Sequence, residues 1–257
     1  MPDLTPPVAF VIGGSGTLGG LVCRRLAEAG CDVVIGHRPA GEGVLRAQAV
    51  RAQVETAGRA VRTVGIDVAD PASVDAATDA AAAAFGRLDI LVVASGIARA
   101  AAPVPPGDIA AFTPDLWDTL IAVNLRGPFL AARAAAPYLR AAPGGGRIVL
   151  VGSTVGMGRW GALYPFAPSK AAIAPLTRYL AATLAPDIAV NCVAPGLMEG
   201  TGLSSGASES FVAEWREAAA LQRTTDPVDV AAQICAFALG GSATGQTLLI
   251  DGGLTFD

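Results

Sequence analysis

Short apolar runs alternate along the whole chain with longer, alanine-rich stretches of helical character. The run Val8–Ile12 is typical of a buried strand, and a glycine-rich turn and a helix from Leu18 to Ala29 follow it. Six further runs have strand character: Val33–Ile35, Val61–Ile66, Ile90–Val93, Ile148–Val151, Ile188–Val193 and Thr247–Ile250. Helical stretches long enough to cross over between parallel strands separate them. The pattern therefore predicts an α/β fold with an open, doubly wound sheet of parallel strands.

Composition favours one soluble globular domain. The 257 residues are 52% hydrophobic, and neither an internal repeat nor a linker divides them. No apolar run reaches the ~18 residues that a membrane helix needs, so we expect no membrane span. A net charge of -4 and the lack of a basic stripe argue against a nucleic-acid partner.

The cysteines and the first residues indicate the compartment. Cys23, Cys31, Cys192 and Cys235 are scattered without metal-ligand spacing, which disfavours a metal site or a disulfide scaffold and fits a reducing compartment. Met1–Pro7 lacks the basic and apolar regions of a signal peptide. We therefore expect a cytoplasmic protein without a bound metal.

Basic residues are used unevenly. The chain has 17 arginines but a single lysine, Lys170, and a single histidine, His37. The single lysine either has no special role in a chain that uses arginine almost everywhere, or it provides a compact, titratable ammonium that arginine cannot.

The first chemical motif is the segment Gly13-Gly14-Ser15-Gly16-Thr17-Leu18-Gly19 between the first strand and the first helix. Its glycines allow the backbone to approach a pyrophosphate, and the amides and positive dipole end of the helix point at the charge. The segment predicts a phosphate-binding loop.

Further motifs follow in order: Asp67-Val68, Val123-Asn124-Leu125, Val151-Gly152-Ser153, Ser169-Lys170-Ala171-Ala172, Asn191–Gly196 and Thr244–Gly253. Together with the loop, they resemble the short-chain dehydrogenase/reductase family over nearly the whole chain. The resemblance implies a single Rossmann-type domain over residues 1–257, with a seven-stranded parallel sheet, helices on both faces and a bound nicotinamide nucleotide. It also implies a homo-oligomer, a dimer or a tetramer.

The end of the second strand bears on the type of nucleotide. An acidic residue there would bond a ribose 2′-hydroxyl, whereas the chain has Gly36-His37-Arg38. Arg38 can pair with a 2′-phosphate and His37 could add a donor, so the sequence favours NADP(H) over NAD(H). In similar proteins the Asp67 position accepts a bond from the adenine amine and Val68 packs on the ring. Alternatively, Asp67 caps the helix that begins near Pro71.

The resemblance extends the nucleotide site to residues at several strand ends. These expected contacts are Gly13, Ser15, Gly16, Thr17, Leu18, Gly19, His37, Arg38, Asp67, Val68, Ala94, Ser95, Gly96, Lys170, Pro195, Gly196 and Met198.

The resemblance places the family's catalytic tetrad at Asn124, Ser153 and Lys170, with the tyrosine still to be located. The Asn124 carbonyl could hold a water beside the lysine, the Ser153 hydroxyl could bond a substrate oxygen, and the Lys170 ammonium would bind the nicotinamide ribose. The residue four before Lys170 and thirteen after Ser153, where the family has its tyrosine, is Phe166. The nearest phenol is Tyr164, expected in extended chain because Pro165 follows it. Pro168 fits a first helical turn, and Pro175 should kink the helix after it.

Other positions also depart from the family pattern. Thr17 replaces the second loop glycine, Ile12 replaces a threonine, and Val93-Ala94-Ser95-Gly96 replaces Asn-Asn-Ala-Gly. The sequence thus resembles a divergent member of the short-chain dehydrogenase/reductase family.

Three functions remain open. The first is an NADPH-dependent reductase whose proton comes from Tyr164, Ser153 or a water held by Asn124 and Lys170. Its substrate is then a conjugated or aromatic carbonyl, of quinone or polyketide type, because the product anion is itself stable. The second is a non-redox cyclase, dehydratase or isomerase that keeps the nucleotide. The third is an NADP-sensing binding protein.

The least regular segments, Ala98–Pro114 and Leu197–Ala213, follow strands and so should lie where ligands bind. We expect residues 197–221 to form a substrate lid, with apolar surface from Met198, Leu203, Phe211 and Trp215, and from Trp160 and Leu163 in another loop. This suits a flat hydrophobic small molecule, or else the residues simply pack together. The Ala-rich, Arg-over-Lys composition resembles that of actinobacterial proteins of secondary metabolism.

Overall fold

The fold was obtained as a computed structural model, which describes residues 5–98, 109–157 and 166–255. Its centre is one sheet of seven strands in the order β3-β2-β1-β4-β5-β6-β7, and every neighbouring pair is parallel. The strands are β1 (Val8–Ile12), β2 (Asp32–His37), β3 (Val61–Gly65), β4 (Ile90–Val93), β5 (Gly146–Val151), β6 (Ile188–Pro195) and β7 (Thr247–Ile250). The predicted doubly wound parallel sheet is confirmed, strand by strand.

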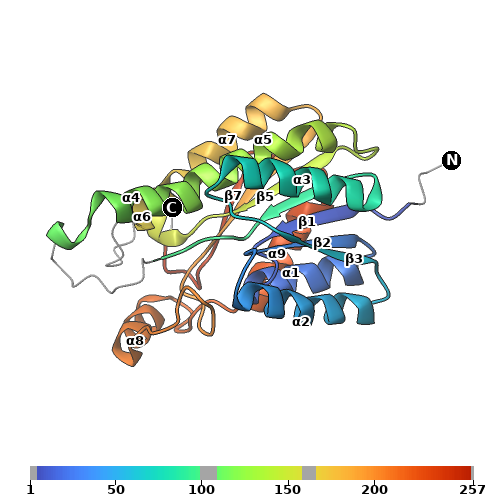
Figure 1. Cartoon of the computed structure of the whole chain (residues 1–257). Helices are drawn as coiled ribbons and strands as arrows, with labels where there is room; N and C mark the ends of the chain where they lie inside the picture. Colours follow the sequence, from blue (N-terminus) through green and yellow to red (C-terminus); the bar gives the residue numbers. More distant parts are fainter. Residues whose placement is uncertain (1–4, 99–108, 158–165, 256–257) are drawn as a thin grey trace.

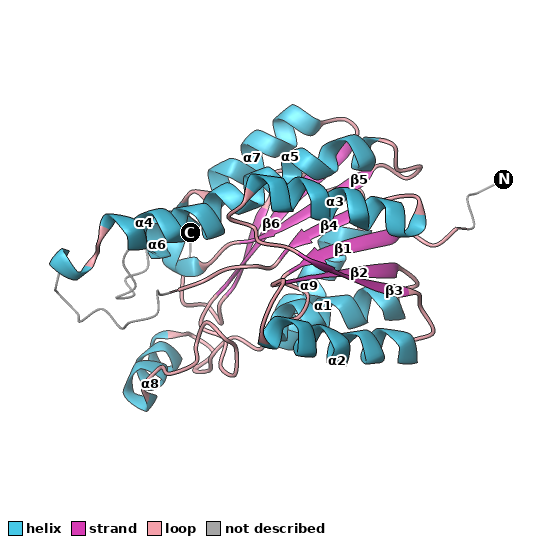
Figure 2. Cartoon of the chain, viewed as in Figure 1, coloured by secondary structure: helices cyan, strands magenta, loops and turns pink. Residues whose placement is uncertain are grey.

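Helices cover both faces of the sheet (Figure 1). One layer holds α1 (Thr17–Glu28), α2 (Glu42–Thr56) and α9 (Pro227–Leu239), and the other holds α3 (Pro71–Phe85), α5 (Gly127–Arg140) and α7 (Ile173–Leu184). Three shorter helices, α4 (Pro114–Ile121), α6 (Phe166–Ala171) and α8 (Glu209–Ala218), lie beyond one edge of the strands (Figure 2). Within the described ranges, no helix is both long and apolar enough to cross a membrane.

Each face of the sheet has its own apolar core. Phe10, Leu91 and Ile148 are fully buried on the face that carries α3, α5 and α7. Val11 and Val92, the neighbours of Phe10 and Leu91 along the chain, point instead into the core beneath α1 and α9. Burial on both faces explains why the central strands are continuous apolar runs instead of alternating ones.

The direction of winding reverses between β1 and β4. From β1 the chain moves outward to β2 and β3, then returns to β4 on the other side of β1. The loops that leave the carboxyl ends of β1 and β4 therefore diverge, which opens the crevice where such sheets bind ligands. The carboxyl ends of the strands point toward α4, α6 and α8 in Figures 1 and 2.

Two helical irregularities occur near this edge. Between α4 and α5 the helix widens into a π-helical turn, η2 (Ala122–Arg126), centred on Asn124. The helix that begins at Phe166 breaks at Ala172, so that α7 starts at Ile173 with Pro175 in its first turn. Pro175 has no N–H to give to the preceding turn, and the predicted kink is thus confirmed as a break.

Candidate active site

The loop after β1 folds so tightly that side chains are excluded from it. A β-carbon on Gly19 would lie 2.1 Å from the Gly13 carbonyl oxygen, and one on Gly13 would lie 2.7 Å from the Ser95 nitrogen. Gly13 also has a positive φ of 82°, which L-residues rarely adopt. These close approaches leave the loop backbone bare at the carboxyl end of β1.

The start of α1 offers unused donors to an anion. Its N-cap is Gly16, which has no side chain to accept bonds from the first-turn amides. Thr17 is the first helical residue and is exposed, and Leu18 is buried behind it. Thr17 Oγ1 donates to the Gly200 carbonyl at 3.3 Å, so the substituted threonine links this loop to the segment before α8. The loop with its Ser15 thus fits a pyrophosphate.

The end of β4 faces the same crevice. Ala94 and Ser95 pack against Gly13, and the Ser95 hydroxyl is buried without a hydrogen-bond partner among the described residues. A buried orphan hydroxyl is uncommon, and a bound nucleotide would supply a partner. Gly96 comes next, and a β-carbon there would lie 3.3 Å from Asn124 Oδ1 and 3.5 Å from Lys170 Nζ. This strand end therefore connects the phosphate loop with the predicted catalytic residues.

Arg38 and His37 differ in what they can offer to a phosphate. Arg38 is exposed directly after β2. His37 is buried, and its Nδ1 lies 2.7 Å from the Arg38 carbonyl oxygen. A carbonyl only accepts, so Nδ1 carries the hydrogen and the neutral ring presents Nε2 as an acceptor. Arg38 is consequently the stronger candidate for a 2′-phosphate.

Asp67 is not the cap of the next helix. Asp70 is the N-cap residue of α3, and its side chain accepts from the Ala72 amide. Asp67 is exposed, and its Oδ1 accepts from the Ala69 amide at 2.9 Å. Val68 beside it is buried in the apolar core. The capping alternative is therefore wrong, and Asp67 stays a predicted adenine contact.

Asn124 links the loop after β4 to α6 by hydrogen bonds. Its Oδ1 accepts from the Ile97 amide at 2.9 Å, and its Nδ2 donates to the Ile97 carbonyl at 2.8 Å and to Ser169 Oγ at 3.1 Å. The side chain is fully buried, and the π-helical turn aims it inward. Its amide oxygen accepts one bond here and has a second lone pair that a water could use.

Ser153 and Lys170 lie on turns that pack directly against each other. Ser153 follows β5 at the start of the turn η3 (Thr154–Met157). A β-carbon on Gly156 in that turn would lie 2.5 Å from the Ala171 nitrogen and 2.6 Å from the Lys170 carbonyl carbon. The turn that follows Ser153 thus packs against the helix that carries Lys170, and Asn124 and Lys170 both lie near Gly96.

Lys170 is a buried cation without a carboxylate partner in the described part of the chain. Its side chain is 4% exposed, and Nζ donates to the Val151 carbonyl at 2.8 Å. Burial lowers the pKa of Lys170 from 10.5 to about 8, and the nearby Cys192 thiol opposes this slightly. The same burial raises the pKa of Cys192 to about 11, so that thiol remains protonated near neutral pH.

Phe166 occupies the side of α6 one turn before Lys170. Its ring centroid lies 6.0 Å from Lys170 Nζ, within the range of a cation–π contact. The ring is buried in a small apolar cluster with Ala98 and Val155, and Trp215 of α8 packs against this cluster. The neighbour of the ammonium is therefore a hydrocarbon ring without a hydroxyl. Tyr164, Trp160 and Leu163 lie outside the described residues.

Residues 197–221, the segment predicted as a lid, are buried in the core near Met198 and reach the Phe166 cluster at Trp215. Pro195 closes β6, and a β-carbon on Gly196 would lie 2.7 Å from Thr225 Oγ1. Met198 is buried in the core beneath α1 and α9. Trp215, by contrast, pairs with Phe211 at 5.9 Å between ring centroids and reaches the Phe166 cluster. Among the described residues of the predicted lid, Trp215 thus packs against the cluster that contains Phe166 of α6.

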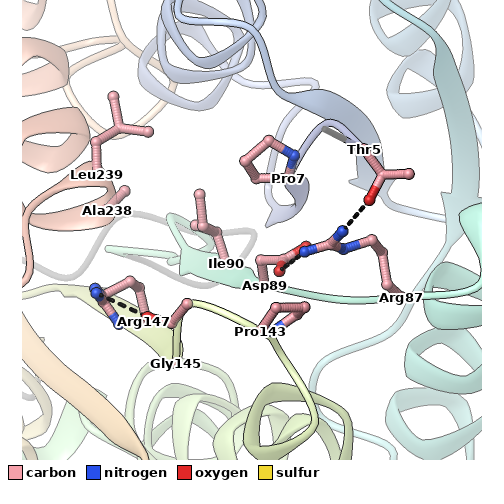
Figure 3. Close-up of a pocket in the computed structure, with 11 residues that line it drawn as sticks. Thr5, Pro7, Arg87, Asp89, Ile90, Pro143, Gly145, Arg147, Ala238 and Leu239 are labelled. Carbon is pink, nitrogen blue, oxygen red and sulfur yellow. Dashed lines mark hydrogen bonds and ion pairs between the residues drawn. The ribbon is translucent and has the colours of Figure 1, made fainter. Parts of the chain in front are cut away.

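A separate hollow of about 400 Å³ lies at the opposite end of the sheet (Figure 3). It is lined by residues at the amino ends of the strands, among them Pro7, Asp89 and Arg147. Asp89 pairs with Arg87 at 2.7 Å, and Arg147 Nε donates to the Gly240 carbonyl at 2.6 Å. These arginines serve as cross-links between loops, and the hollow is far from the residues assembled above.

Replacing Lys170 with methionine is expected to stabilise the fold at pH 7 by about 3 kcal/mol. The lysine pKa is lowered from 10.5 to about 8 on folding, so the unfolded chain holds the proton more tightly. The free-energy cost of burying the charged ammonium is present in full below pH 8. It disappears as the pH rises from 8 to 10.5, because the folded protein loses the proton first. The free energy of unfolding of the wild type therefore increases across that range. Urea unfolding at pH 7 and pH 10.5 measures this.

The exposed Arg178 of α7 provides the control, because Arg178→Met removes a cation without relieving burial. A Lys170→Met variant that is less stable than wild type at pH 7, or equally stabilised at both pH values, contradicts this account of the buried ammonium.

Two features of the site could not be found from the sequence. The bonds of Asn124 to Ile97 depend on the π-helical turn, which no residue pattern marks. The contact of Trp215 with the Phe166 cluster joins two helices far apart in the chain. The sequence showed only that the segments around Asn124 and Trp215 are apolar, which did not predict these contacts.

Comparison with known proteins gives concordant matches. The family model described as enoyl-(acyl carrier protein) reductase matches residues 15–255. A Streptomyces violaceoruber protein assigned as ketoacyl reductase 2 of the granaticin polyketide synthase is 36% identical over 96% of this chain and 95% of its own length. Cis-4-hydroxycyclohexanecarboxylate dehydrogenase of Sinomonas cyclohexanicum is also 36% identical, over 96% of each chain. Among solved structures, a blue fluorescent protein from a metagenomic library in complex with NADPH has a TM-score of 0.86 and 31% identity over 99% of this chain and 100% of its own.

Proposed function

Since the chain belongs to the short-chain dehydrogenase/reductase family and is an oxidoreductase of that type, we propose that it reduces a conjugated or aromatic carbonyl compound with NADPH. The observation that carries this proposal is the position of Phe166, whose ring centroid lies 6.0 Å from Lys170 Nζ. The ammonium has a hydrocarbon ring where the resemblance leads us to expect a phenol. The function must therefore be one that works without that phenol.

Residues of the crevice fit a nicotinamide dinucleotide. The bare loop at Gly13–Gly19, the uncapped first turn of α1 and the orphan Ser95 hydroxyl would hold its phosphate and ribose groups. When bound, the reduced nucleotide supplies a hydride to the carbonyl carbon of the substrate. The exposed Arg38 supports NADPH as the form used, and a structural relative is bound to NADPH.

The chain's own residues then manage the developing oxyanion. The Ser153 hydroxyl donates a bond to the substrate oxygen, and the Lys170 ammonium adds positive charge in a site of low dielectric constant. Asn124 keeps the loop after β4 in place through Ile97. The proton for the oxygen comes from Tyr164, Ser153 or a water beside Lys170.

The missing phenol limits the substrates that can be reduced. A positioned general acid contributes about 10²–10⁴-fold to a proton transfer. A simple ketone needs this help because its alkoxide is a strong base. A quinone, an enone or a polyketide that becomes a phenol yields a delocalised anion, which needs little help. The granaticin relative, whose name places it in a polyketide synthase, supports the second group.

An apolar cluster beside Lys170 favours a flat apolar substrate. Ala98, Val155 and Phe166 form a continuous apolar cluster, and the indole of Trp215 packs against it. Phe211 extends this surface along α8. Burial of an aromatic ring against such a surface makes the binding free energy more favourable. These side chains have no charged group to pair with a charged substrate.

A second candidate, also supported by the apolar ring beside Lys170, is a non-redox cyclase, dehydratase or isomerase that retains the nucleotide. In it, Ser153 and Lys170 stabilise an enolate while Phe166 serves as a wall, and no hydride moves.

One assay separates the two candidates. Purified protein is incubated with NADPH and, in turn, a quinone, an enone and a simple cyclic ketone. We expect loss of absorbance at 340 nm in step with product for the conjugated compounds and about 10²-fold slower loss for the ketone. Product that forms without loss of NADPH excludes the reductase in favour of the second candidate.

A further inference from the structure

The protein has a single lysine, Lys170. The ring of Phe166 lies near its ammonium, at the position where the family has a tyrosine. Besides Tyr164, Ser153 and a bound water, the Lys170 ammonium is a fourth possible source of the proton. The contacts around Lys170 bear on this role, which rests on the proposed reductase function.

Other groups near Lys170 are poor acids or already engaged. Ser169 Oγ donates to the Phe166 carbonyl at 2.7 Å, and Thr154 Oγ1 donates to the Pro195 carbonyl at 3.4 Å. Burial raises the pKa of Cys192 to about 11. A serine hydroxyl such as that of Ser153 passes on a proton only if another acid resupplies it. The ammonium is the acid that remains among the described residues.

The ammonium is also placed at the reacting edge of the sheet. Nζ lies 2.8 Å from the Val151 carbonyl at the end of β5, two residues before Ser153. On its other side is Gly96, where a β-carbon would lie 3.5 Å from Nζ. Nζ therefore lies close to the ends of β4 and β5, and position 96 presents no side chain toward it.

Charges on the surrounding elements do not hold the proton on Lys170. No carboxylate of the described residues pairs with Nζ, and the titratable neighbour acting on it is Cys192 of β6. The charged residues of α4, η2 and α7 are all exposed: Asp115, Asp118, Arg126 and Arg178. An ammonium in such surroundings gives up a proton more readily than one in water, as the lowering of its pKa to about 8 indicates.

We propose that the Lys170 ammonium, which donates to the Val151 carbonyl two residues before Ser153, is itself the proton donor in place of the absent phenol. In the balanced step, hydride adds to the substrate carbon, the C=O electron pair moves onto oxygen, and that oxygen takes one proton from Nζ. Lys170 is left as a neutral amine and regains its proton from solvent before the next turnover. The Ser153 hydroxyl bonds the same oxygen and is unchanged at the end.

The first measurement uses the nucleotide-free protein. Protein grown with [ε-¹³C]lysine carries one labelled carbon, because Lys170 is the only lysine in the sequence. We expect its NMR shift to titrate with a pKa of about 8 instead of 10.5. A midpoint near 10.5 overturns the proposal, since such an amine would be no better an acid than a lysine in water.

The second measurement follows single-turnover reduction of a quinone or enone at saturating NADPH. The rate should fall tenfold per pH unit above the midpoint found by NMR, because the donor must be protonated. Lys170→Arg keeps the positive charge but cannot release a proton, so we expect a loss of about 10²-fold and a flat pH profile. NADPH binding by this variant, measured by calorimetry, should persist.

Two further variants complete the test. Adding Phe166→Tyr to Lys170→Arg should restore at least tenfold, because a phenol again stands on the turn before residue 170. Tyr164→Phe separates the ammonium from the phenol, because reduction depends on residue 164 only if the phenol is the donor. If Lys170→Arg keeps the wild-type rate and pH profile, or if Tyr164→Phe abolishes reduction, Lys170 is not the donor. If wild-type protein oxidises no NADPH with any carbonyl compound, the proposed function itself fails.

Discussion

Phe166→Tyr is expected to raise the rate of reduction of a simple cyclic ketone by about 10²-fold or more. Position 166 lies four residues before Lys170 on the same side of α6, and its ring centroid is 6.0 Å from Nζ. A phenol at this point places an acidic hydroxyl on the ring nearest the ammonium. The ammonium lowers the pKa of that hydroxyl, which makes it a better acid near neutral pH. Steady-state kinetics with NADPH and the ketone measures the gain.

The gain should be selective. The quinone or enone, whose anion is already delocalised, should gain less than tenfold because proton donation limits its reduction less. Phe166→Leu is the matched control, because it alters the same buried cluster without adding a hydroxyl. Equal gains in both variants would mean that space, and not acidity, limits the wild-type enzyme. No gain in a Phe166→Tyr protein that still folds and binds NADPH contradicts the assigned role of position 166.

Arg38→Asp is expected to reverse the nucleotide preference of the enzyme. Arg38 is exposed at the carboxyl end of β2, where the ribose of an adenine nucleotide would approach. Loss of a charge-assisted pair with a 2′-phosphate costs about 3 kcal/mol, which corresponds to about 10²-fold in affinity. The new carboxylate repels the phosphate but can accept a bond from the 2′-hydroxyl of NADH. The ratio of kcat/KM for NADPH to that for NADH reports the change.

Arg62→Asp on β3 makes the same change of charge at a neighbouring strand. The Arg62 guanidinium stacks over Phe85 at 5.7 Å and donates to the Val61 carbonyl, so its side chain is engaged elsewhere. We expect this control to alter the ratio less than threefold. A similar loss of NADPH use in both variants would point to net charge instead of a specific contact, and an unchanged ratio in Arg38→Asp would remove the basis for preferring NADPH.

The fold was predictable because local pattern and packing agree in this chain. Each central strand is buried on both faces, so a continuous apolar run such as Val8–Ile12 marks it directly. Boundaries were less predictable: β2 extends to His37 and β6 to Pro195, beyond the apolar runs that predict them. Hydrogen bonds of the parallel ladder continue through such residues whether or not they are apolar.

The site was predictable to the extent that it is local. The spacing of Phe166 and Lys170 on one helix places the ring near the ammonium, as the structure has it. The partners of Asn124 were not predictable, because the π-helical turn shifts its side chain out of ordinary helical register. The tautomer of His37 likewise depends on one backbone carbonyl, that of Arg38. Such contacts are set by tertiary geometry and leave no spacing in the sequence.

Titration of the purified protein with NADPH and NADH in a calorimeter measures whether the crevice between the ends of β1 and β4 holds a nicotinamide dinucleotide. We expect one site per chain, with a Kd for NADPH of about 1–100 µM and binding of NADH at least tenfold weaker. Folded protein that takes up neither nucleotide would contradict it.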